Sequence, residues 1–144
     1  MNQEDELFTP LLVCAADTFA VCEGAHYLYR MVEGSRNNTP CIDNKLSFFT
    51  ISEALFEKSK QALTEPKRAM LENRGKFMFR RGLLEHNELI KDGRKQLACA
   101  AVRVCKRFPE AAEDTGRLRR LIKLLGPKCG IGAFLRLSAF LSRA

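Results

Sequence analysis

Apolar residues in this chain recur every three and four positions, which is the spacing that puts side chains on one face of an α-helix. The clearest case is the segment 94–108, whose apolar members fall at i, i+4, i+7, i+8 and i+11: Leu97, Ala101, Val104, Cys105 and Phe108. At about 100° per residue these side chains share one face, opposite a cluster of Lys and Arg. The pattern predicts a helix over residues 94–108 with one buried side.

The first helix is predicted over about residues 10–33. Thr9 followed by Pro10 is typical of a helix start, because proline suits the first helical position. Gly34 and the polar residues after it are typical of a helix end. Between these ends, apolar residues recur at the spacing of one buried face: Leu12, Ala15, Ala16, Phe19, Cys22 and Ala25.

The second helix is predicted over about residues 51–63. Thr50 and Glu53 form the T-x-x-E pattern of a capping box, in which each side chain satisfies the free backbone amide of the other residue. Pro66 closes this segment and begins the next, because proline lacks an amide hydrogen and suits only the first turn of a helix. The third helix is predicted over about 67–91, although its apolar residues surround most of the axis and 76–80 also fits a short extended segment.

Two more helical segments follow the segment 94–108. Thr115 is the predicted cap of a short helix that ends at Gly126 and Pro127, the usual glycine and proline stop. The last segment, 131–141, is apolar around nearly its whole circumference, which predicts burial in protein or lipid.

These segments predict an all-α fold, an irregular bundle of five or six helices in a single domain over residues 1–144. The length of 144 residues fits one domain, and the chain shows no internal repeat and no long linker. No stretch approaches the roughly 20 apolar residues that span a bilayer, and the first twelve residues are acidic where a secretory signal is basic. We therefore expect a soluble protein of the cytoplasm or the nucleus.

The net charge of +7 hides a division between an acidic N-terminal half and a basic C-terminal half. Residues 1–66 contain five Lys or Arg and ten Asp or Glu, whereas residues 67–144 contain nineteen and seven. The formal charges are therefore −5 and +12. This asymmetry favours a polyanionic partner for the second half, although the two halves would also neutralise each other if they packed together.

The basic residues of the second half are the candidate nucleic-acid-binding residues. If their helix faces align, they form a track suited to phosphates, on RNA rather than DNA by a small margin and with little sequence preference. Phe77 and Phe79 lie beside cations and suit either base stacking or the core. The candidates are Lys67, Arg68, Arg80, Arg81, Arg94, Lys95, Arg103, Lys106, Arg107, Arg117, Arg119, Arg120 and Lys123. The leading hypothesis is a non-enzymatic RNA- or DNA-binding protein, such as a small viral or regulatory factor; the competing interpretation is a solvated basic surface.

Catalytic and metal-binding patterns are sparse. Cys22 and His26 lie at i and i+4 and would supply two zinc ligands, but two ligands do not make a site. Neither His26 nor His86 belongs to a nucleophile motif, and no phosphate-binding glycine loop is present. The six cysteines lack the spacing of a disulfide framework and are interpreted as reduced thiols, with Cys14, Cys99 and Cys105 as core residues. We expect no catalytic residue, no metal site and no cofactor.

The C-terminal segment supports a second hypothesis, a protein-interaction or membrane-surface module. Leu, Ile and Phe combined with arginine are typical of helices that lie on anionic membranes, and a buried hairpin explains them equally. The sixteen residues GPKCGIGAFLRLSAFL resemble the central helix region of Bcl-2-type proteins, small helical bundles that bind a partner helix in a groove. The Asn-Trp-Gly-Arg signature of that family is absent, so no residue role is carried over. A homo-oligomer is a further expectation, because a short bundle with extra apolar faces completes its core by pairing.

Overall fold

The chain forms a bundle of helices in the computed structural model, which describes residues 4–20, 23–24, 42–84, 91–113 and 116–141. The elements in chain order are α1 (Asp5–Ala15), α2 (Ile42–Ser59), α3 (Glu65–Leu84), α4 (Lys91–Arg107), the short 3-10 helix η1 (Pro109–Ala112) and α5 (Gly116–Leu141). No strand occurs within these ranges. The predicted all-α bundle is therefore confirmed.

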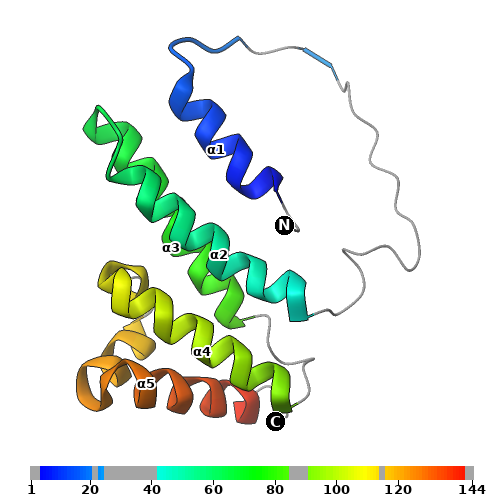
Figure 1. The fold of residues 1–144 in the computed structure, drawn as a ribbon, viewed down its shortest axis with the longest axis vertical. Coiled ribbons are helices and arrows are strands. Elements are labelled where there is room, and N and C mark those ends of the chain that lie inside the picture. The colour runs from blue at the N-terminus through cyan, green and yellow to red at the C-terminus, as the bar shows by residue number, and fades with distance from the viewer. Residues whose placement is uncertain (1–3, 21–22, 25–41, 85–90, 114–115, 142–144) are drawn as a thin grey trace.

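The helices are arranged in three layers (Figure 1). The antiparallel pair α2 and α3 occupies the middle, α1 packs on one side of the pair, and α4, η1 and α5 pack on the other side. Two glycines of α3 allow the close contact between the middle helices. A Cβ atom at Gly75 would lie 3.1 Å from the Phe56 ring, and one at Gly82 would lie 2.9 Å from the Phe49 ring. The Ser52 hydroxyl also donates a buried 2.8 Å hydrogen bond to the Gly75 carbonyl.

The main core lies between the middle pair and the α4–α5 layer. Phe49 meets Phe79 edge-on with ring centroids 5.7 Å apart, and Phe56 stacks on Phe108 at 5.1 Å. Such aromatic pairs add about 0.5–1.5 kcal/mol beyond the burial of their area. The predicted apolar face of α4 is confirmed, because all five of its members are buried in this core: Leu97, Ala101, Val104, Cys105 and Phe108.

A smaller second core joins α1 to the middle pair. It contains the fully buried Phe48, Ile51, Leu55 and Met78 together with Leu71. Three partly buried residues of α1 pack against it, namely Leu7, Leu11 and Cys14. No residue of α1 is itself buried, so this helix is attached through one side only.

The predicted first helix was wrong at both of its ends. The helix starts at Asp5 and contains Pro10 in its interior, and it ends at Ala15, after which Ala16 has extended backbone. Two acidic residues in the first turn favour this earlier start through the helix dipole. The described residues 16–20 and 23–24 are not helical, and the rest of the predicted helix lies outside the described residues.

The predicted start of the second helix was also wrong. Helix α2 begins at Ile42, and Thr50 lies in its interior, where the hydroxyl donates to the Leu46 carbonyl at 3.4 Å. No capping box forms here, because the helix starts before Thr50, and the Glu53 carboxylate pairs instead with Arg103 of α4. The predicted break near Pro66 is confirmed, since α2 ends at Ser59 and α3 starts at Glu65. Residues 76–80 are helical, so the extended alternative for that stretch is wrong.

Helix α5 is kinked at Gly126, where the predicted glycine stop lies. Gly126 has φ 74° and ψ 165°, a conformation essentially restricted to glycine. The kink separates an arm of residues 116–125 from an arm of residues 127–141. The arms touch at Gly130, where a Cβ would lie 2.7 Å from the backbone of Ile122. Leu118 from the first arm and Ile131 from the second both enter the main core.

Candidate nucleic-acid interface

Positive charge is concentrated in the α4–α5 layer. The two helices together contain twelve Lys or Arg and one Asp or Glu, which is Asp92. Helix α5 contains no acidic residue, and α1, in the opposite layer, contains two acidic residues and no Lys or Arg. The two outer layers thus carry opposite charge, while the middle pair combines α2 from the acidic half of the sequence with α3 from the basic half (Figure 1). A field of one sign on one side of a protein attracts polyanions to that side.

The buried face of α4 determines which cations point outward. Because Leu97, Ala101 and Val104 fix one side of the helix in the core, the opposite side is exposed. That exposed side carries four of the candidate residues: Lys95, Arg103, Lys106 and Arg107. The predicted basic face of this helix is therefore present.

Two of these four cations are engaged by acidic residues of α2. The Arg103 Nε donates to Glu53 Oε1 at 2.8 Å, and the Arg107 guanidinium lies 2.9 Å from Glu57 Oε1. The side chain of Glu53 is only 15% exposed, whereas that of Arg103 is 60% exposed. Surface ion pairs of this kind contribute about 0–1 kcal/mol. They neutralise two cations of α4 on the side that faces α2.

Acidic residues also engage cations of α3. Arg81 pairs with Glu6 of α1 at 3.1 Å, and Arg74 pairs with the same carboxylate. Arg68 pairs with Glu65 at 3.0 Å within α3. Burial lowers the pKa of the Arg74 guanidinium, the neighbouring Arg81 lowers it further, and Asp5 opposes the shift. Because Glu6 belongs to α1, the ion pairs of Arg74 and Arg81 with Glu6 help to hold α1 against α3.

The remaining described candidates carry no ion pair within the part of the chain that the structure describes. Lys95 and Lys106 on α4 and Arg119 and Arg120 on α5 are exposed, as is Lys128 of α5, which the sequence analysis missed. Lys128 is the only cation in a glycine-rich stretch, so the sequence shows no cluster of cations on one helical face at that point. On α3, Lys67 is half-buried and Arg80 is exposed, with its guanidinium 6.0 Å from the Phe77 ring centroid. The side chains of Arg94, Arg117 and Lys123 lie outside the described residues.

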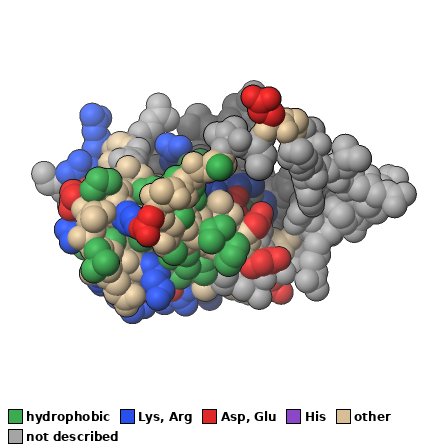
Figure 2. All heavy atoms as spheres, turned by 90° about the horizontal axis from the view of Figure 1, so that it is seen from above, with side chains coloured by type: hydrophobic (Ala, Val, Ile, Leu, Met, Phe, Trp, Pro, Cys, Tyr) green, Lys and Arg blue, Asp and Glu red, His purple; other side chains and the backbone are tan. Residues whose placement is uncertain are grey.

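Lys and Arg side chains do not form one continuous track on the face that Figure 2 shows, which is the side of α1 and the α2–α3 turn and not that of the α4–α5 layer. Lys and Arg side chains lie mainly toward the rim of this face, and acidic and apolar side chains separate them. Of the ten candidates whose side chains are described, four are in ion pairs: Arg68, Arg81, Arg103 and Arg107. Helices α4 and α5 pack against each other, whereas α3 also packs against α1.

Phe77 and Phe79 differ in their surroundings. Phe79 is fully buried in the main core and is unavailable to a ligand. Phe77 is 39% exposed, and the Arg74 guanidinium lies 4.9 Å from its ring centroid. This contact is a cation–π interaction within the protein. Base stacking on Phe79 would require opening the core, so Phe77 alone retains an accessible ring.

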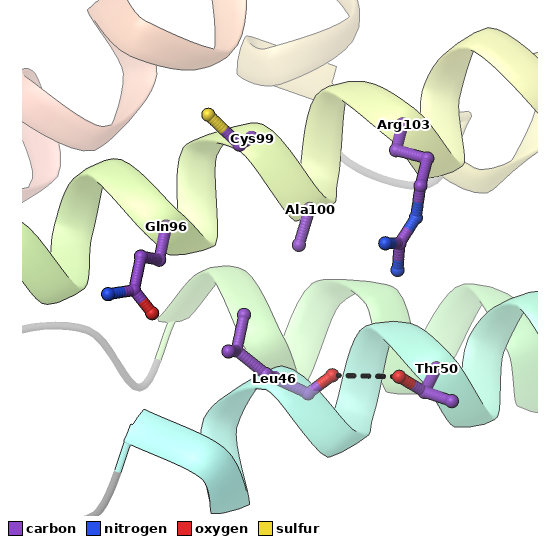
Figure 3. Close-up of a pocket in the computed structure, with 6 residues that line it drawn as sticks. All are labelled: Leu46, Thr50, Gln96, Cys99, Ala100 and Arg103. Carbon is purple, nitrogen blue, oxygen red and sulfur yellow. Dashed lines mark hydrogen bonds between the residues drawn. The ribbon is translucent and has the colours of Figure 1, made fainter.

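A shallow groove of about 500 Å³ runs between α2 and α4 (Figure 3). Gln96 and Arg103 extend from α4 toward α2, whose Leu46 and Thr50 form the other wall, while Cys99 points away from α2. Cys99 is exposed, so its predicted place in the core was wrong. Cys105 is buried as predicted, and burial raises the pKa of its thiol to about 12.

The described cysteines, Cys14, Cys99, Cys105 and Cys129, are free thiols. Cys22, His26 and His86, on which a zinc site or a catalytic pair would depend, lie outside the described residues. Among the residues that are described, no group of three His, Cys, Asp or Glu side chains is placed to hold a metal ion. No helix in the described part combines the length and apolar character needed to cross a membrane.

Comparison with known proteins identifies no relative of this chain. No protein-family model matches the chain, and neither a curated protein nor a solved structure matches it significantly.

Proposed function

We propose that this protein binds the phosphate backbone of nucleic acid through the α4–α5 layer. The observation that carries the proposal is the charge of that layer, twelve Lys or Arg against one Asp or Glu, with five exposed cations outside any described ion pair. They are Lys95, Lys106, Arg119, Arg120 and Lys128. Lysine and arginine that neutralise phosphates release condensed counterions, which favours binding without regard to base sequence.

The ion pairs of the structure narrow the proposed interface relative to the thirteen candidates. Arg68 and Arg81 contact carboxylates of α3 and α1, so they belong to the packing of those helices. Arg103 and Arg107 lie at the edge of the exposed face of α4 and form ion pairs with carboxylates of α2. The central part of the interface is therefore the exposed outer side of α4 together with the first arm of α5 and Lys128, which lies just beyond the kink.

The direct test measures binding to labelled random-sequence RNA and DNA, single-stranded and duplex, by fluorescence anisotropy over a series of salt concentrations. Log affinity should fall linearly with log salt, with a slope of about −0.7 per phosphate contact on single strands and −0.9 on duplexes. Replacing four interface cations by alanine should remove about 2.8 from the single-strand slope, at roughly 0.7 each. The four substitutions are Lys95→Ala, Lys106→Ala, Arg119→Ala and Arg120→Ala.

A charge-matched control separates a defined interface from attraction by net charge. The control variant also loses four positive charges, but from α2, α3 and the turn between them: Lys58→Ala, Lys60→Ala, Arg68→Ala and Arg80→Ala. We expect it to keep most of the wild-type slope. Equal losses of slope in the two variants, or no binding of any probe at low salt, would overturn the proposal. The single-stranded and duplex probes also show which nucleic acid is preferred.

A further inference from the structure

The two outer layers of the bundle carry complementary exposed surfaces. On α1, Phe8 is 63% and Leu12 is 55% exposed, and they lie one helical turn apart on the side that faces away from α2 and α3. On the first arm of α5, Leu124 is 79% and Leu125 is 51% exposed. Large apolar side chains that are grouped and exposed in this way mark interaction sites.

The charges around the two apolar pairs are opposite in sign. The α1 surface, defined by Phe8 and Leu12, is flanked by the exposed carboxylates Glu4 and Asp5, and α1 has no basic residue. The α5 surface, defined by Leu124 and Leu125, lies one helical turn after exposed Arg120, exposed Lys128 follows beyond the kink, and α5 has no acidic residue. Each surface therefore has an apolar centre and a charged rim, and the rim of one surface is opposite in charge to the rim of the other. Such complementarity favours specific docking.

These surfaces cannot meet within one molecule. Helix α1 packs on α2 and α3, and α5 packs on α4 and η1. The α2–α3 pair lies between them, as Figure 1 shows. Contact between the α1 surface and the α5 surface therefore requires two copies of the chain. Because the two surfaces differ, the contact is head-to-tail and leaves one free surface at each end of a pair, so it extends into rings or open chains.

We propose that the protein self-associates head-to-tail, with the α1 surface of one copy docked on the α5 surface of the next. The apolar pairs form the centre of the contact, and the carboxylates of α1 face the cations of α5 across its rim. The contact shares Arg120 and Lys128 with the proposed nucleic-acid interface, so it is measured with protein freed of nucleic acid.

Complementation between two variants tests this geometry by sedimentation velocity. One variant loses the α1 surface through Phe8→Ala and Leu12→Ala, and the other loses the α5 surface through Leu124→Ala and Leu125→Ala. The side chains removed are more than half exposed, so both variants should keep the far-ultraviolet circular dichroism of the wild type. The wild type should grow in average mass with concentration, and each variant alone should be monomeric. An equal mixture should form a 1:1 heterodimer and no larger species, because only one α1 surface and one α5 surface remain.

A control removes an exposed leucine from neither surface. Leu63, in the turn between α2 and α3, is 97% exposed, and Leu63→Ala should associate as the wild type does. A wild type that stays monomeric at all concentrations would overturn the proposal. A mixture that stays monomeric would also overturn it, and so would association of either surface variant alone, because a two-fold symmetric contact through α1 leaves the α5 variant dimeric.

Discussion

The contact between the two arms of α5 predicts a large effect for a very small substitution, Gly130→Ala. The added Cβ would lie 2.7 Å from the Cα and N of Ile122 and from the carbonyl carbon of Leu121, which are all backbone atoms. Overpacking costs about 1–3 kcal/mol of stability where side chains can shift. Because the neighbours here are backbone atoms, which cannot rotate away, we expect Gly130→Ala to lower the free energy of unfolding by about 3 kcal/mol. At roughly 2–4 °C per kcal/mol for a domain near this size, Tm should fall by about 6–12 °C.

A glycine two residues further along provides the matched control. A Cβ at Gly132 would meet nothing within 4 Å, and alanine is favoured over glycine inside a helix by about 0.5–1 kcal/mol. Gly132→Ala should therefore be neutral or stabilising in urea and thermal unfolding followed by circular dichroism. A Gly130→Ala variant that unfolds at the wild-type midpoint, or an equal loss of stability in both variants, would contradict the close contact between the two arms.

Three further predictions concern the core, the ion pairs and the thiols. Phe56→Ala should lower the free energy of unfolding by about 3–5 kcal/mol in a urea titration, because Phe56 is 1% exposed; a loss below 1 kcal/mol would contradict the packing described. Glu53→Gln with Glu57→Gln should strengthen nucleic-acid binding and steepen its salt slope by up to about 1.8, because two α4 arginines become available to phosphates; an unchanged slope counts against the interface. In alkylation followed by mass spectrometry, Cys99 should react well before Cys105. Burial raises the pKa of Cys105 in the folded state from 9.0 to about 12. The stability that the buried neutral thiol contributes should therefore be complete below pH 9. It should fall as the pH rises toward 12, by at most about 1.4 kcal/mol per pH unit. The difference between the wild type and a Cys105→Ala variant should show that slope, and a pH-independent difference would contradict it.

The sequence was sufficient for elements whose apolar residues follow a regular period. Helix α4 has one clean apolar face, and that face is buried in the main core. The segment of α3 looked irregular because its apolar residues surround most of the axis, yet two glycines within it, Gly75 and Gly82, have a packing role. They admit the rings of Phe56 and Phe49, which come from residues 19 and 33 positions earlier in the chain. Local periodicity cannot detect such contacts.

Helix ends were predicted less well, because capping patterns compete with tertiary contacts. Thr50 and Glu53 match a capping box, but α2 starts at Ile42 and buries Phe48 and Phe49 ahead of Thr50. Thr9 and Pro10 match a helix start, but Leu7 and Leu11 pack on the second core and extend the helix on both sides of the proline. In both cases long-range packing determines the observed helix boundary.

The candidate site shows the same division between local and long-range information. The sequence located the cations and the basic face of α4, because charge and helical period are local properties. It did not show which cations have carboxylate partners, since Glu6 lies 75 positions from Arg81 in the chain. Nucleic-acid binding by the remaining cations is still a prediction.

The most direct measurement of that prediction is lysine footprinting with and without single-stranded RNA at low salt. Acetylation rates at individual lysines are read by mass spectrometry. The proposed interface predicts strong protection of Lys95, Lys106 and Lys128, with Lys58 and Lys60 of the α2 end modified at the same rate in both samples. Unprotected lysines on α4 and α5, or equal protection at all five positions, would contradict binding through the α4–α5 layer.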